Sequence, residues 1–122
     1  MNNTRKPGRP ADPDLQARRR DEILDAAVTI FSEKGYDDAD TQELADRLGV
    51  AKGTVYRYFP SKRELFQAVI HRAMAQLKAW VDEHVAKVAD PLEEMIVGMR
   101  AYLEFFDRHP EVVELLIQER AR

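Results

Sequence analysis

The residues best suited to bind a charged ligand lie in one stretch, GTVYRYFPSKREL, residues 53–65. This stretch places Arg57, Lys62 and Arg63 beside two tyrosines and a phenylalanine. A guanidinium can form two hydrogen bonds to the edge of guanine, and a tyrosine hydroxyl can bind a phosphate oxygen while its ring packs on the protein. The stretch therefore indicates a surface that binds a polyanion. The alternative is that it only joins two helices.

The charge distribution favours a polyanion-binding surface in one part of a weakly acidic chain. The 122 residues carry a formal net charge of −3, which argues against a protein that coats nucleic acid indiscriminately. Residues 47–63, however, hold five basic residues and no acidic one. Residues 67–122 hold seven basic and ten acidic residues, so the positive charge is concentrated towards the N-terminal half.

The composition bounds the class of protein. With 44% hydrophobic and 34% charged residues, 122 residues suit one globular domain, or a small domain and part of a second. No apolar run approaches the roughly 20 residues that span a bilayer, and no secretory signal is visible, so we expect a cytoplasmic protein without a membrane partner. The chain has no cysteine, and its three histidines show no metal-binding spacing, so no metal or other cofactor is expected.

Apolar residues recur at helical spacing along the chain and predict an all-α fold. Local start and stop residues divide the pattern into six helices. The first predicted helix runs from about Leu15 to Lys34 and is ended by Gly35 as a left-handed cap. The second begins after Asp40, with a capping box of Asp40 and Glu43, and runs to about Leu48; the third spans about Lys52 to Tyr58 and is closed by Pro60. The fourth is long, opens with a capping box of Ser61 and Glu64 and reaches about Val88; the fifth begins at Pro91 after Asp90, and the sixth follows Pro110.

The second and third predicted helices have the layout of a helix-turn-helix module packed on the first helix. Gly49 permits a tight turn between them, and the third helix would present its N-terminal and outer side to base edges in a DNA groove. Gly53, without a side chain, would let the backbone approach the groove closely. The candidates for reading bases are Lys52, Gly53, Thr54 and Arg57, and those for holding phosphates are Tyr56, Tyr58 and Lys62.

The segment GVAKGTVYRYFPSKRELF, residues 49–66, resembles the tetracycline-repressor-like (TetR) family of transcriptional regulators. The preceding ILDAAVTIFSEKGYDDADTQELADRLG is similar to the first two helices of that family. The resemblance covers about residues 18–66. It implies a homodimer that binds a near-palindromic operator in double-stranded DNA through two recognition helices. It also implies a helical C-terminal domain that dimerises and binds a small-molecule inducer, and we expect a repressor released by that ligand.

Carried over by position, the resemblance adds Thr41 and Gln42 to the operator contacts already named, with Thr41 as a phosphate contact. One position departs from the family, which often has Ser or Thr where this chain has Asp40. A phosphate would repel this carboxylate unless capping bonds turn it inward. The contacts from the second helix are therefore the least specified by the sequence.

We divide the chain into a flexible basic arm (residues 1–14), a helix-turn-helix domain (residues 15–66) and a partial C-terminal helical domain for ligand binding and dimerisation (residues 67–122). The long fourth helix joins the two domains. The arm contains a Gly-Arg-Pro element similar to those that place arginine in a narrow minor groove, with Arg5, Lys6 and Arg9 as candidates. The alternative is a plain basic tail.

The C-terminal helices carry Met and aromatic residues that are candidates for an inducer pocket, because such pockets are apolar with a few polar groups. The alternative is that these residues form plain core. The resemblance also implies a chain longer than 122 residues, so the last dimerisation helices are expected to be missing. The pocket candidates are Trp80, Met95, Met99, Tyr102, Phe106 and His109.

Other classes of function fit the sequence less well. It contains no glycine-rich phosphate loop, no HExxH and no nucleophile motif, so we do not expect an enzyme. A helical dimerisation or adaptor module without DNA binding would account for the apolar helices. It would not account for the acid-free basic segment of residues 47–63.

Overall fold

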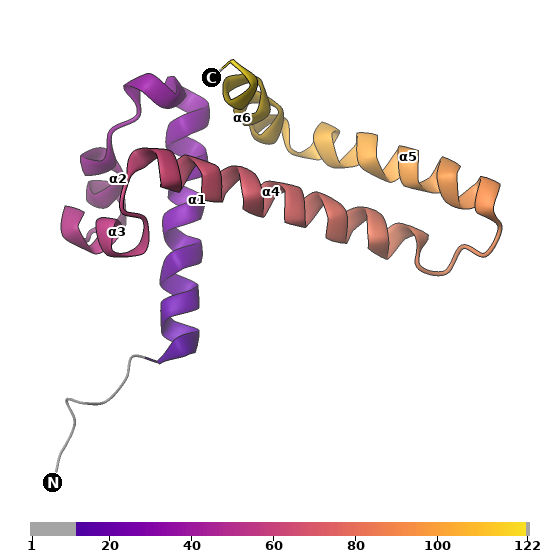
Figure 1. The fold of residues 1–122 in the computed structure, drawn as a ribbon, viewed down its shortest axis with the longest axis horizontal. Coiled ribbons are helices and arrows are strands. Elements are labelled where there is room, and N and C mark those ends of the chain that lie inside the picture. The colour runs from indigo at the N-terminus through magenta and orange to yellow at the C-terminus, as the bar shows by residue number, and fades with distance from the viewer. Residues whose placement is uncertain (1–11, 122) are drawn as a thin grey trace, which may run out of the picture.

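The computed structural model describes residues 12–121, and every regular element in that range is an α-helix, which confirms the all-α prediction. The helices are α1 (Pro13–Asp38), α2 (Thr41–Leu48), α3 (Lys52–Tyr58), α4 (Lys62–Val85), α5 (Pro91–Arg108) and α6 (Pro110–Arg120). Figure 1 shows α1 crossing α4, with α2 and α3 on one side of the crossing. On the other side α4 and α5 form a long antiparallel pair, and α6 returns to α1. Between residues 12 and 121 no helix is long and apolar enough to cross a membrane.

The first helix begins at Pro13, two residues before the predicted start at about Leu15. The carboxylate of Asp12 accepts the backbone N–H of Asp14 at 3.0 Å and caps the helix. Proline is favoured at the first helical position, where its missing N–H has no intrahelical acceptor to lose. The arm candidates Arg5, Lys6 and Arg9 lie outside the described residues.

Gly35 interrupts α1 where the helix was predicted to end, but not with the predicted conformation. Its φ of 81° and ψ of 165° differ from a left-handed helical cap in ψ, and a positive φ of this kind favours glycine. One more helical turn over residues 36–38 follows, and the backbone N–H of Ala39 donates to the Gly35 carbonyl at 3.1 Å. The chain thus reverses before the extended residues Ala39 and Asp40 lead into α2.

Most of the remaining helix ends follow the predicted capping residues. The carboxylate of Asp40 accepts the Gln42 N–H at 2.9 Å, and Gly49 has the left-handed conformation that ends α2. The Ser61 hydroxyl accepts the Glu64 N–H at 3.1 Å at the start of α4. Helix α4 ends at Val85 rather than near Val88, because residues 86–90 form the turn that lets α5 pack back on α4.

The core of the molecule is built on α1 and includes a residue from the far end of the chain. Leu115 of α6 is fully buried in it. A smaller cluster of Ala73, Phe105 and Val112 holds α4, α5 and α6 together. The main cluster comprises Ile23, Leu24, Ala27, Ile30, Phe31, Ala39, Leu44, Ala45, Val55, Phe59, Leu65, Phe66, Val69 and Leu115.

Candidate nucleic-acid interface

Helix α3 is anchored in the core by one buried side chain, and its other residues are exposed or half-buried. Val55 is 1% exposed and packs in the main core, whereas Lys52, Gly53 and Arg57 are exposed. Thr54 and Tyr58 are half-buried, and Tyr56 is 38% exposed. A short helix that packs on the core through one face and exposes the opposite face resembles a recognition helix.

The charged groups of α3 are available for an external anion. Within residues 12–121, neither Lys52 nor Arg57 pairs with a carboxylate. The Lys52 ammonium lies 5.7 Å from the centre of the Tyr56 ring, which places both groups on one surface. Helix α3, with the sequence KGTVYRY, itself carries no carboxylate that could compete for these two groups.

The N-terminal end of α1 lies beside α3 and contributes residues that the sequence analysis did not assign. Gln16 and Arg19 of α1 line a groove with Arg57 and Tyr58 of α3. Arg19 makes only a long contact with a carboxylate, 3.8 Å from its Nε to Glu22 Oε1. The signal for this contribution was present in the sequence as the basic run of residues 18–20, at the start of the predicted first helix.

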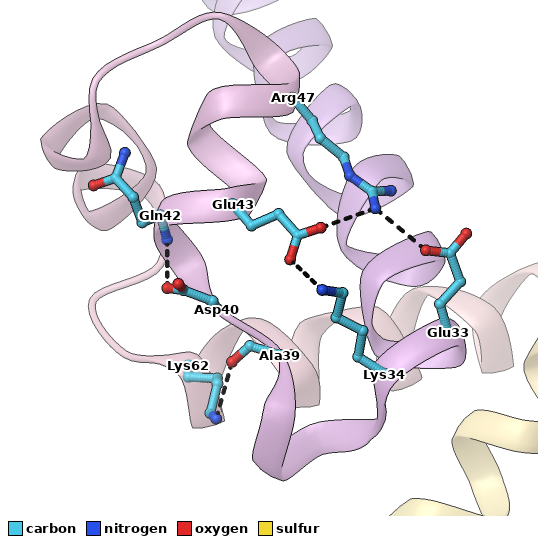
Figure 2. A network of polar contacts seen from close by, with 8 residues as sticks. All are labelled: Glu33, Lys34, Ala39, Asp40, Gln42, Glu43, Arg47 and Lys62. Atoms are coloured by element: carbon cyan, nitrogen blue, oxygen red, sulfur yellow. Dashed lines mark hydrogen bonds and ion pairs between the residues drawn. The ribbon is translucent and has the colours of Figure 1, made fainter.

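At the N-terminus of α2, the candidates are less open than those of α3. Thr41 is 8% exposed, so most of its side chain is shielded by the fold. Gln42 is exposed, and its amide Nε2 donates to Asp46 Oδ1 at 2.9 Å. The carboxylate of Asp40 accepts the backbone N–H of Gln42, as Figure 2 shows, so the N-terminus of α2 compensates the negative charge of Asp40.

An ion-pair network joins α1 to α2 and uses Arg47 from the acid-free segment. Arg47 Nη2 lies 3.2 Å from Glu33 Oε1 and 3.0 Å from Glu43 Oε2, and Lys34 Nζ lies 2.9 Å from Glu43 Oε1 (Figure 2). The Lys34 hydrogen bond lowers the pKa of Glu43, and the Glu33 and Glu43 hydrogen bonds raise the pKa of Arg47. Glu43 therefore ties α1 to α2 instead of completing a capping box with Asp40.

Lys62 is the first residue of α4 and points back at the chain before α2. Its ammonium Nζ lies 3.2 Å from the carbonyl oxygens of Asp37 and of Ala39. It also lies 4.7 Å from the centre of the Tyr36 ring. The structure thus gives this predicted phosphate contact three partners within the protein.

The six pocket candidates differ in exposure and in the groups that they contact. Met95, Met99 and Tyr102 are 49–61% exposed on the outer face of α5. The Trp80 indole N–H donates to the Ala101 carbonyl at 2.8 Å. Phe106 lines an open apolar groove with Tyr102. The centre of the His109 ring lies 4.5 Å from the centre of the Phe105 ring. No group of three metal-ligating side chains occurs among residues 12–121.

Comparison with known proteins places this geometry in a family. Residues 23–69 match the tetR family of bacterial regulatory proteins. The HTH-type transcriptional repressor KstR of Mycobacterium tuberculosis is 33% identical over 103 residues, which are 84% of this chain and 47% of that protein. The HTH-type transcriptional activator FasR of Mycolicibacterium smegmatis is 31% identical over 100 residues, 82% of this chain and 46% of that protein.

A solved structure agrees with these sequence matches. A TetR-like transcriptional regulator from Rhodococcus sp. RHA1 superposes with a TM-score of 0.73 at 27% identity, over 88% of this chain and 57% of that one. The chain spans about half the length of the curated relatives it matches. The matched range runs from the middle of α1 into α4 and contains all of α2 and α3. Residues 23–69 of this chain therefore belong to the tetR family of bacterial regulatory proteins.

Proposed function

We propose that this chain is the DNA-binding part of a transcriptional regulator that binds a near-palindromic operator in double-stranded DNA. The observation that carries the proposal is the outer face of α3, where Lys52, Tyr56 and Arg57 are exposed near Gly53 and have no carboxylate partner among residues 12–121. A face of this kind can enter a major groove and donate to base edges and phosphates. Regulators of transcription among the relatives support the same reading.

The position of each side chain supports the role that we propose for it. Arg57, Lys52 and Thr54 read bases, and Gly53 lets the backbone approach the groove, while Tyr56 and Tyr58 hold phosphates. Arg19 extends the phosphate-binding surface from α1, because it shares a groove with Arg57. Thr41 and Gln42 act at the edge of the interface, the first mainly through its backbone because its side chain is shielded.

The proposed intact regulator is a homodimer that a small-molecule inducer releases from DNA. The outer face of α5 supports an assembly role, because it exposes large apolar side chains that this chain leaves uncovered. The repressor KstR among the relatives supports repression as the sign of regulation. Such a protein acts in the cytoplasm without a membrane partner and without catalysis. The exposed apolar residues of α5 are Leu92, Met95, Ile96, Met99, Tyr102 and Leu103.

The test is a selection of bound sequences from random duplex DNA with the 122-residue chain. A palindrome whose half-sites lie about one helical turn apart, roughly 34 Å, or a multiple of it is the expected result. Recovery of a single half-site would keep DNA binding and show that the 122-residue chain by itself binds as a monomer. If no sequence is enriched, the proposed function is wrong. At present, no observation on the described residues favours the adaptor module over a DNA-binding regulator.

A further inference from the structure

The Lys62 ammonium makes several contacts within the protein, which a direct phosphate contact would not require. An ammonium has three N–H donors and no acceptor. Two of the three are directed at the carbonyl oxygens of Asp37 and Ala39, each 3.2 Å away, and the Tyr36 ring covers a further side at 4.7 Å. The side chain is half-buried. Its hydrogen-bonding capacity is therefore largely used inside the protein.

The acceptors of Lys62 belong to the segment that reverses the chain between α1 and α2. This segment, residues 35–39, begins at Gly35 with positive φ and ends at Ala39, which is extended and 7% exposed. Hydrogen bonds from an ammonium to carbonyl oxygens are stronger than neutral ones, and they fix the direction of the peptide groups that accept them. The ammonium thus holds residues 35–39 against the start of α4.

The position of residues 35–39 determines where α2 begins. Asp40 follows Ala39 directly and caps α2 through the N–H of Gln42 (Figure 2). The Leu44 N–H then donates to the Asp40 carbonyl at 3.2 Å as the first backbone bond of the helix. A displacement of Ala39 therefore displaces the N-terminus of α2, which the proposed function places beside DNA.

We propose that Lys62 is a positioning residue that sets the N-terminus of α2 for operator binding, instead of contacting a phosphate itself. This inference rests on the proposed DNA-binding function. The two roles differ in a measurable way. A lysine bound to phosphate releases counterions and contributes about −0.9 to the slope of log affinity against log salt concentration, whereas a positioning residue contributes nothing to that slope.

The first experiment uses the free 122-residue chain and Lys62→Met, which keeps an apolar stem of similar length and removes the donors. Amide hydrogen exchange of Gln42 and Leu44 should become about tenfold faster, because the α2 N-terminus opens more often. Arg63→Met is the matched control, since it removes the same charge from the next, exposed position. It should leave the exchange of both amides unchanged, and unchanged exchange in Lys62→Met would overturn the proposal.

The second experiment measures binding to the duplex recovered by the random selection at several salt concentrations. Lys62→Met should bind about tenfold more weakly at each concentration with the same slope as the parent chain. A slope shallower by about 0.9 would identify a direct phosphate contact and overturn the proposal. Lys62→Gln, whose amide keeps donors without the charge, should be intermediate in exchange and affinity, and it supplies both readouts if Lys62→Met loses its helical circular dichroism.

The two proposals fail in different ways. If the proposed function is wrong, the parent chain binds no duplex, while the exchange of Gln42 and Leu44 in the free variants still shows whether Lys62 holds α2. If only the role of Lys62 is wrong, the parent binds the selected duplex and Lys62→Met keeps slow exchange at α2.

Discussion

Replacing Gly53 with alanine should stabilise the free chain and weaken its binding to DNA. Gly53 lies in the first turn of α3, and a Cβ built on it meets nothing within 4 Å. Nothing within residues 12–121 therefore requires glycine at this position. If glycine is needed, the reason is a surface that approaches the backbone from outside, and a DNA groove is the surface that the proposed function supplies.

The two effects have opposite signs and estimable sizes. Alanine is favoured over glycine by up to about 1 kcal/mol inside a helix, so a gain of roughly 0.5–1 kcal/mol is expected in a first turn. For a domain of this size that gain raises the melting temperature by roughly 2–6 °C. A methyl group between the α3 backbone and the base edges displaces contacts worth about 1–3 kcal/mol, which weakens binding by about 5-fold to 160-fold.

Thermal unfolding followed by circular dichroism and titration of a labelled duplex measure the two effects. Gly98→Ala is the matched control, because a Cβ at Gly98 on α5 meets Val85 Cγ1 at 3.6 Å and Val81 Cγ1 at 4.0 Å, both ordinary contacts. It should raise the melting temperature and leave the affinity unchanged. Parental affinity in Gly53→Ala would refute the close approach of the backbone, and a lowered melting temperature would refute the open space beside it.

Three further predictions concern base reading, ion pairing and the core. Arg57→Ala should cost about 1–3 kcal/mol of operator binding and relax the base preference at one position, which a repeated selection on the variant detects. Lys34 lowers the pKa of Glu43, so the ionised Glu43 stabilises the folded state above about pH 4.5, and this contribution is lost as the pH falls through the lowered pKa. Glu43→Gln should therefore unfold at less urea than the parent at pH 7 and at the same urea near about pH 2. Leu115→Ala should lower the free energy of unfolding in urea by about 2–5 kcal/mol, whereas Leu103→Ala, at a residue 66% exposed, should change it by less than about 0.5 kcal/mol.

Helix boundaries could be predicted where one local interaction decides them. Asp40, Ser61 and Asp90 each cap a helix through a side chain bonded two or three residues ahead, which sequence spacing alone reveals. The predictions were wrong at Pro13 and Gly35. Pro13 was interpreted as a residue that prevents a helix, although it begins one. Gly35 was predicted to adopt the left-handed helical conformation, but glycine with positive φ can adopt other values of ψ.

The exposed face of α3 could be predicted for the same local reason, whereas the roles of residues around it could not. Arg47 pairs with Glu33, 14 residues earlier, and Lys62 bonds to a carbonyl 25 residues earlier. Such pairs depend on how α1, α2 and α4 pack, and the residue types are equally suited to binding phosphate. A basic residue in an acid-free segment is therefore a candidate for DNA contact only until a tertiary partner is found for it.

Helix α4 connects the proposed DNA surface to the C-terminal half, and its contacts limit how a ligand could act. Arg72 of α4 pairs with Asp25 of α1 at 2.8 Å. On α6, the Gln118 amide Nε2 donates to the Phe31 carbonyl of α1 at 3.0 Å, while its buried Oε1 has no hydrogen-bond partner within the described residues. A ligand shifts a conformation only by binding one arrangement better than another. Moving α4 along α1 breaks the ion pair of Arg72 with Asp25, and moving α6 away from α1 breaks the hydrogen bond of Gln118 to Phe31, so a ligand that moves either helix has to compensate for the contact that is lost.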